Sequence, residues 1–205
     1  SPPLGLAYVA SSLEEDGHEV RMVDSRAMGY GLSQIKREIS SFCPDIVGLT
    51  ATTPAIYSAY KVADVVKQVS RDTKVVLGGP HASFMAEDVL RECPSIDFVV
   101  RGEGEETMRE LLRSIEDPKK GLGITYRERG VIKSTPNRLL IKSLDDLPSP
   151  AYHLLPMDKY RADGIRYGVL LTSRGCPFSC IFCCSSRLMG KVWRGHSKER
   201  VLYEL

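Results

Sequence analysis

The chain has 205 residues, of which 42% are hydrophobic and 26% are charged, and its formal net charge is +2. This length suffices for one full domain and part of another, or for two small domains, and the composition is that of an ordinary globular protein. So small a charge excludes an argument for nucleic acid or an anionic membrane surface as a partner. Because no apolar run reaches the roughly 20 residues that cross a bilayer, we also expect no membrane span.

The first part of the chain alternates helices with short apolar strands. Apolar residues at i, i+3, i+4 and i+7 predict helices, and continuous apolar runs predict strands buried on both faces. The predicted helices cover residues 4–16, 33–43, 53–69 and 83–92 and a segment that includes 108–115, and the predicted strands cover residues 20–24, 45–50, 74–77 and 98–100. This alternation is typical of a parallel sheet with helices on both faces. We therefore predict a doubly wound, flavodoxin- or Rossmann-like α/β sheet of five strands, with one strand upstream of residue 1.

From Gly121 onward the pattern changes. Residues 124–127 and 131–134 flank a turn that ends at Gly130, which predicts a hairpin. Residues 139–160 contain three prolines and show no sustained period, so they are predicted to form a linker. A strand over residues 167–171 and a helix from residue 197 are expected to follow. The predicted domains are therefore residues 1–120, a hairpin and linker over 121–165, and residues 166–205.

Three cysteines follow the last predicted strand with the spacing Cys176-x3-Cys180-x2-Cys183. Three thiolates on one tight loop can hold three irons of a [4Fe-4S] cluster and leave the fourth iron open, whereas an electron-carrying cluster normally has four cysteines. A zinc site completed by His196 is an alternative, although structural zinc usually shows two pairs of closely spaced ligands. Structural or redox thiols are a second alternative. Reduced, clustered cysteines favour a cytoplasmic location.

This loop, with an aromatic residue before its last cysteine, resembles the cluster loop of the radical S-adenosylmethionine (SAM) superfamily. The resemblance implies that Cys176, Cys180 and Cys183 bind a [4Fe-4S] cluster, that the open iron binds SAM, and that Phe182 lies beside the adenine. It also implies a small-molecule substrate and an electron donor such as flavodoxin or ferredoxin. Cys184 has no place in the pattern.

Small and hydroxyl-bearing residues follow the predicted strands, where ligands bind in open α/β sheets. Each has a structural interpretation on its own: Gly78 and Gly79 can form a tight turn, and Thr53 can cap a helix. A dinucleotide site is disfavoured, because Gly102-x-Gly104 lacks the third glycine of that fingerprint and follows a late strand.

In combination, the segments Pro44-Asp-Ile-Val-Gly-Leu-Thr50, Leu77-Gly-Gly-Pro-His81 and Val100-Arg-Gly-Glu-Gly-Glu105 upstream of the cysteine loop resemble the cobalamin-binding domain of B12-dependent radical SAM enzymes. That domain is flavodoxin-like and precedes the first strand and cluster loop of a SAM barrel. The resemblance implies a cobalamin pocket that is lined by Thr50, Thr52, Gly78, Gly79, Pro80 and Gly102. The histidine motif Asp-x-His-x-x-Gly is absent, so we predict that no protein histidine coordinates cobalt.

The expected function is that of a cobalamin-dependent radical SAM enzyme, foremost a methyltransferase. Two alternatives stay open: a cobalamin-binding module without catalysis, and a radical SAM cyclase or rearrangement enzyme. Full (β/α)₈ barrels need about 200 residues, and few residues follow Cys183. We therefore expect these 205 residues alone to be inactive, and we assign no catalytic side chain.

Overall fold

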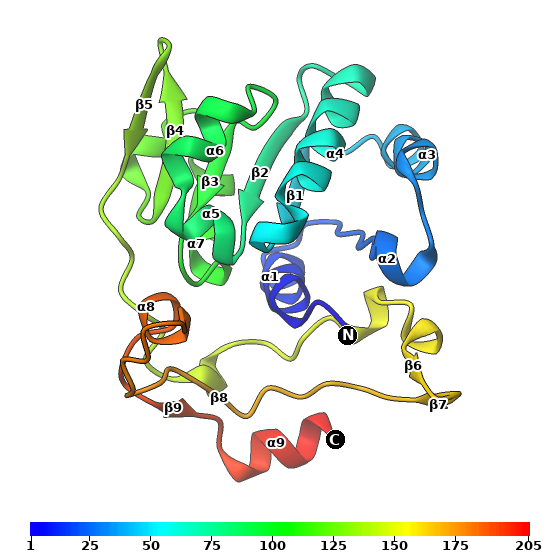
Figure 1. Cartoon of the computed structure of the whole chain (residues 1–205), viewed down its shortest axis with the longest axis vertical. Coiled ribbons are helices and arrows are strands. Elements are labelled where there is room, and N and C mark those ends of the chain that lie inside the picture. Colours follow the sequence, from blue (N-terminus) through cyan, green and yellow to red (C-terminus); the bar gives the residue numbers. More distant parts are fainter. The chain divides into compact units, whose positions relative to one another are not determined.

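A computed structural model describes residues 1–205 (Figure 1). The chain folds into two compact units. Unit 1 comprises Ser1–Met28 and Leu139–Leu205, and unit 2 comprises Gly29–Arg138. Each unit is described by itself below. None of the helices is both long and apolar enough to cross a bilayer.

Unit 2 is built on a five-stranded sheet with the order β1-β2-β3-β4-β5. Its first three strands are parallel: β1 (Ile46–Thr50), β2 (Lys74–Gly78) and β3 (Phe98–Val100). The hairpin strands β4 (Ile124–Glu128) and β5 (Val131–Ser134) continue the sheet in antiparallel fashion beside β3. The predicted hairpin is thus confirmed, and it is part of the main sheet.

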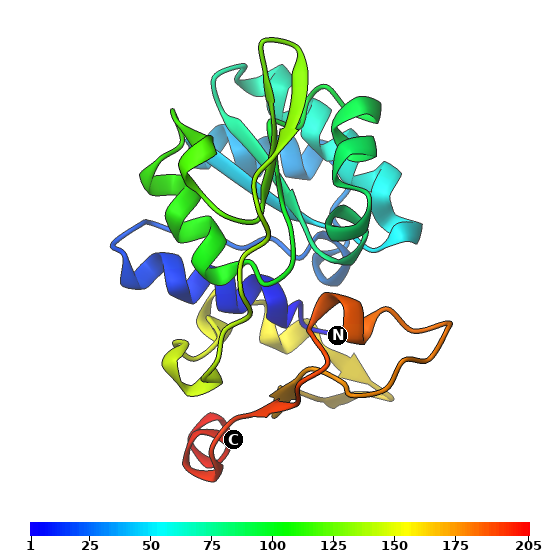
Figure 2. The same cartoon turned by 90° about the vertical axis from the view of Figure 1, so that its left-hand side faces the viewer.

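Helices cover both faces of this sheet. They are α3 (Leu32–Phe42), α4 (Ile56–Val69), α5 (Pro80–Phe84), α6 (Ala86–Glu92) and α7 (Glu105–Arg113), with short 3₁₀ turns η1 (Thr53–Ala55) and η2 (Pro118–Lys120). Figure 2 shows α7 on the face opposite to α4 and α6. This arrangement confirms the predicted doubly wound α/β class, although the predicted helix over 83–92 is divided into α5 and α6 at Met85.

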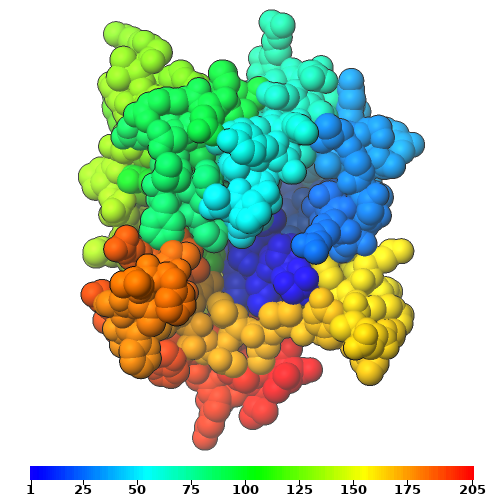
Figure 3. Space-filling view, viewed as in Figure 1, coloured from blue at the N-terminus to red at the C-terminus, as the bar shows by residue number.

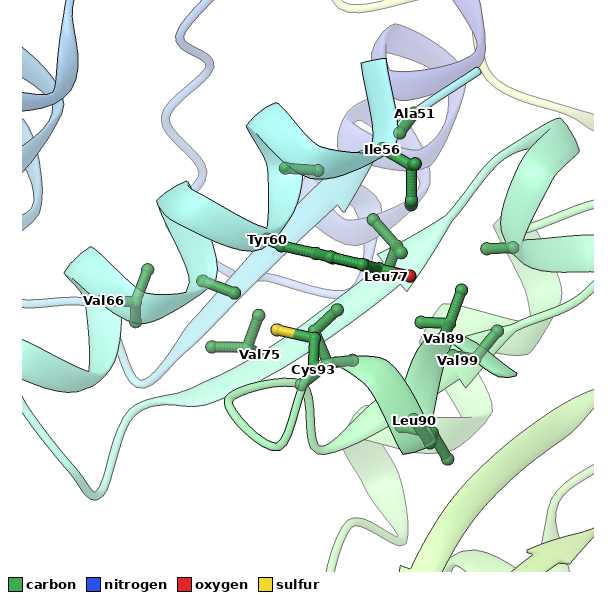
Figure 4. Packing of buried hydrophobic residues seen from close by; sticks show 14 of the residues in the cluster. Ala51, Ile56, Tyr60, Val66, Val75, Leu77, Val89, Leu90, Cys93 and Val99 are labelled. Carbon is green, nitrogen blue, oxygen red and sulfur yellow. The ribbon is translucent and has the colours of Figure 1, made fainter. Parts of the chain in front are cut away.

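The core of unit 2 lies between β2 and the helices α4 and α6. Val75 and Leu77 point to this side because alternate residues of a strand face the same way, and both are fully buried. Tyr60 extends from α4 toward Leu77 (Figure 4), and its hydroxyl donates to Glu92 at 3.0 Å. Desolvation and this hydrogen bond raise the pKa of Tyr60. The parallel strands therefore pack on a well-filled hydrophobic core, which fixes the position of their ends.

Leu77→Ala is expected to lower the free energy of unfolding by about 2–5 kcal/mol, because Leu77 has no exposed surface and the substitution leaves a cavity. Urea denaturation followed by circular dichroism measures this loss. The matched variant Val131→Ala changes a side chain that is 58% exposed on β5, so it is expected to cost less than about 1 kcal/mol. Equal losses in the two variants would contradict the assignment of this core.

Unit 1 brings the two ends of the chain together. Its N-terminal part holds α1 (Leu4–Glu15) and α2 (Ser25–Met28). Its C-terminal part holds the 3₁₀ turns η3 (Leu144–Asp146), η4 (Tyr152–Leu154) and η5 (Met157–Lys159), the two-residue strand pairs β6–β7 (Arg161–Ala162, Ile165–Arg166) and β8–β9 (Ser173–Arg174, Arg194–Gly195), and the helices α8 (Ser185–Leu188) and α9 (Lys198–Glu204).

The segment predicted as a linker is packed against α1. Tyr8 clusters with the buried side chains of Leu144 and Leu147, and the backbone N–H of Ala151 donates to the carbonyl of Ala7 at 3.0 Å. Residues 139–160 therefore lack regular periodicity because they follow the surface of another element, not because they form a free connection.

Two predicted strands do not form. Residues 20–24 and 167–171 contain no strand, although the helix predicted from residue 197 is present as α9. Both segments have apolar residues, but a strand also requires a partner for its backbone hydrogen bonds, and neither segment pairs in any of the three sheets. The short helix α2 follows residues 20–24 and was not predicted.

Candidate functional site

The loops after β1, β2 and β3 lie at one edge of the sheet of unit 2, because the carboxyl ends of parallel strands share an edge. The first two loops are hydrogen-bonded through His81, whose backbone N–H donates to the carbonyl of Ala51 at 3.4 Å. The His81 ring atom Nδ1 also lies 3.1 Å from the Oγ1 of Thr53. These contacts fix the position of each loop relative to the other.

Ser83 joins the second loop to the third. Its Oγ donates to the carbonyl of Gly79 at 2.9 Å and accepts a hydrogen bond from the backbone N–H of Gly102 at 2.9 Å. All three loops are thus joined by hydrogen bonds from two side chains of α5. Sequence reasoning did not assign His81 or Ser83 a role in the site; their position in the turn of helix directly after Gly79 was the available signal.

The glycines of these loops are required for different reasons. Gly79 has φ of 91°, and a Cβ atom there would lie 2.5 Å from Thr50 Oγ1 and 3.2 Å from the Ala51 carbonyl oxygen. Gly102 has φ of 76°, but a Cβ atom there would meet nothing within 4 Å. Gly79 thus permits close packing of two loops, whereas Gly102 leaves backbone open to a ligand.

The six predicted cobalamin-pocket residues all lie at this edge. Thr50 and Thr52 are exposed, and the other four, Gly78, Gly79, Pro80 and Gly102, are partly buried. The prediction that Thr53 caps a helix was wrong: Thr52 occupies the cap position of η1 without a side-chain hydrogen bond, and the Thr53 hydroxyl binds His81 instead. Open backbone and exposed hydroxyls are groups that could hold the polar edge of a large cofactor.

The cysteine loop belongs to unit 1 and is closed at its base by β8 and β9. Ser173 pairs with Gly195 and Arg174 with Arg194, and the backbone N–H of Cys176 donates to the carbonyl of Gly190 at 3.0 Å. Gly175 lies at this crossing with φ of 91°, where a Cβ atom would collide with the carbonyl of Val192. The narrow base therefore depends on a glycine directly before the first cysteine.

The loop itself is open to solvent and forms the orange part of the surface in Figure 3. None of the six cysteines is in a disulfide; Cys176 and Cys183 are partly buried and Cys180 is exposed. A hydrogen bond with the Ser185 hydroxyl lowers the pKa of Cys183, which favours the thiolate that metal ions bind. Phe182 is 89% exposed.

Free thiols on one loop are the donor set that an iron–sulfur cluster requires. As the side chains stand, no three His, Cys, Asp or Glu residues are arranged to hold a metal ion. Ligation by Cys176, Cys180 and Cys183 thus stays a prediction, as does the contact of Phe182 with adenine.

Comparison with known proteins identifies the first part of the chain. Residues 1–112 match the family model described as the B12 binding domain, which is more than half of the chain. The chain belongs to the B12-binding domain family. Its α/β class is that of a B12-binding domain, as predicted, and the assignment of the individual loop residues to a cobalamin pocket stays a prediction.

Two curated relatives match this B12-binding chain over nearly its whole length. A protein of Pyrococcus horikoshii called uncharacterized methyltransferase PH0819 is 53% identical over 100% of this chain and 45% of its own. The anaerobic magnesium-protoporphyrin IX monomethyl ester cyclase of Rubrivivax gelatinosus is 37% identical over 95% of this chain and 36% of its own. The chain thus spans less than half the length of these relatives.

A solved structure shares the fold. The cobalamin-dependent SAM radical enzyme OxsB, determined with aqua-cobalamin and SAM bound, superimposes with a TM-score of 0.84 at 24% identity. The match covers 99% of this chain and 28% of OxsB. It supports the fold of both the sheet and the segment that carries the cysteines.

Proposed function

We propose that this chain is the cobalamin-binding part and the beginning of the SAM domain of a cobalamin-dependent radical SAM enzyme, and that the whole enzyme is a methyltransferase. One observation carries the proposal. The same B12-binding chain has Gly102, with open space around its Cα, at the edge of the sheet, and three free thiols on the loop whose two ends meet closely at Gly175. The 53% identity to a protein named as a methyltransferase favours methyl transfer.

In this proposal the three loops at the sheet edge hold cobalamin. Gly102 and Gly78 expose backbone to the cofactor, and the hydroxyls of Thr50 and Thr52 donate hydrogen bonds to its polar groups. Gly79 and Pro80 set the turn between them. The loops are joined before the ligand arrives, so binding orders few side chains and loses little conformational entropy.

The thiolates of Cys176, Cys180 and Cys183 would hold a [4Fe-4S] cluster, and Phe182 would pack on the adenine of SAM. When bound, the cluster supplies the electron for reductive cleavage of SAM, and cobalamin supplies the methyl group. A cytoplasmic electron donor such as flavodoxin or ferredoxin and a small-molecule substrate complete the proposal. No side chain of this chain is assigned to the chemical step.

A second candidate is ring formation without methyl transfer, because the relative from Rubrivivax gelatinosus is named as a cyclase and is 37% identical. Isotope transfer separates the two candidates in the full-length enzyme. Label from the methyl group of SAM is expected in the product of a methyltransferase and absent from the product of a cyclase.

The cofactor proposal is tested on the 205-residue chain. One portion is titrated with hydroxocobalamin by equilibrium dialysis, and a second is incubated anaerobically with iron and sulfide and assayed for bound metal. We expect one cobalamin and about four irons per chain. Uptake of one zinc and no iron would refute the radical SAM function, and failure to retain cobalamin would refute the assignment of the sheet edge.

A further inference from the structure

The buried side chain of His196 lies at the centre of a polar cluster outside both candidate cofactor sites. Its side chain is 1% exposed, and its two ring nitrogens contact side chains from distant parts of unit 1. Nδ1 is 2.9 Å from Oδ1 of Asp145 in η3, and Nε2 is 3.4 Å from the hydroxyl of Tyr8 in α1. Three segments that are far apart in the sequence therefore meet at one imidazole.

The direction of these hydrogen bonds follows from their partners. A carboxylate only accepts, so Nδ1 of His196 donates to Asp145. In the neutral ring Nε2 is then the acceptor, and the Tyr8 hydroxyl donates to it. Burial and the nearby Glu204 carboxylate raise the pKa of Tyr8 to about 12, which keeps this hydroxyl protonated. In this row of hydrogen bonds Tyr8 thus donates to His196, and His196 donates to Asp145.

Asp145 also holds the beginning of α9. Its two carboxylate oxygens each lie 3.1 Å from the backbone N–H of Ser197, and the Ser197 hydroxyl accepts from the N–H of Arg200. The hydrogen bonds from His196 and Ser197 hold the pKa of Asp145 below its usual value. One carboxylate thereby fixes both the imidazole and the start of the following helix.

The same histidine closes the base of the cysteine loop. Its backbone N–H donates to the carbonyl of Thr172 at 2.9 Å, next to the β8–β9 pairs. On the other strand of this base, the guanidinium carbon of Arg174 lies 5.1 Å from the centre of the Tyr8 ring. Tyr8 therefore contacts Arg174 in β8, which enters the loop, and His196, which directly follows β9.

We infer that Asp145, His196 and Tyr8 form a clasp that holds the two ends of the cysteine loop together, with Asp145 and His196 as positioning residues for Cys176, Cys180 and Cys183. This role for the cysteines rests on the proposed function. The clasp itself does not, because it requires only the contacts within unit 1. It keeps the ends of the loop adjacent while the thiols stay open to solvent.

Amide hydrogen exchange of the 205-residue chain without iron tests the clasp. Removing a hydrogen bond to a charged group is expected to speed exchange about tenfold at the amides of Cys176 and His196 in Asp145→Ala and His196→Ala. Strand β2 in unit 2 is expected to exchange at the wild-type rate. Asp146→Ala removes the neighbouring, exposed carboxylate of the same turn and is expected to match the wild type.

Two further variants separate the clasp from general damage. His196→Asn retains a donor near the position of Nδ1 and is expected to restore at least half of the protection from exchange that His196→Ala loses. Tyr8→Phe removes only the hydroxyl that contacts Nε2, so it is expected to speed exchange at the amide of His196 less than His196→Ala does. After reconstitution with iron and sulfide, Asp145→Ala is expected to lose iron to a chelator about threefold faster than Asp146→Ala. Wild-type exchange in both alanine variants, or equal acceleration in β2, would overturn the clasp. Failure of the wild-type chain to bind iron would instead refute the proposed function.

Discussion

Cys180→Ala is expected to abolish the broad absorbance at about 400 nm that the wild-type chain acquires on anaerobic incubation with iron and sulfide. A three-cysteine site has no spare ligand, because its fourth iron is the open one. Loss of any one thiolate therefore leaves two, which cannot retain the cluster. Bound iron is expected to fall from about four per chain to less than one.

Cys184→Ala is the matched control for this experiment. Cys184 is exposed, as Cys180 is, and lies directly after Cys183, but it falls outside the spacing Cys176-x3-Cys180-x2-Cys183. This variant is expected to retain the wild-type absorbance and iron content. A cluster that survives Cys180→Ala and is lost in Cys184→Ala would show that the ligand set has been wrongly assigned.

Gly79→Ala is expected to weaken binding of hydroxocobalamin more than tenfold and to lower the free energy of unfolding by about 1–3 kcal/mol. The backbone has φ of 91° at this position, which side chains of L residues rarely adopt. The added Cβ atom would also lie 2.5 Å from Thr50 Oγ1. Rotation of the Thr50 side chain can relieve that contact, but the same Cβ atom would also lie 3.2 Å from the carbonyl oxygen of Ala51, which belongs to the backbone.

Equilibrium dialysis measures the affinity, and urea denaturation measures the stability. Gly48→Ala is the control, because Gly48 lies in β1 of the same sheet, has no positive φ, and a Cβ atom there would meet nothing within 4 Å. It is expected to change the stability by less than about 1 kcal/mol. Wild-type cobalamin affinity in Gly79→Ala would remove the second loop from the proposed pocket.

The clasp is where the sequence carried least information. Tyr8 and His196 are separated by 188 positions, and Asp145 and His196 by 51. Periodicity reports only on neighbours within an element, so the sequence indicates His196 only as a possible zinc ligand. Its buried ring is held by a carboxylate and a phenol, and the structure places it in no metal-binding group.

The amino-acid sequence by itself determined the α/β class, the three parallel strands of unit 2, the position of the glycine-rich loops at the strand ends and the spacing of the cysteines. These features depend on local patterns: apolar runs, helical periodicity and turn residues. Only the tertiary structure decided that the hairpin extends the main sheet and that residues 139–160 pack on α1. It also decided that residues 20–24 and 167–171 form no strand. The physical reason is that strand pairing and side-chain packing join residues far apart in the chain, and the sequence of one segment does not specify its partner.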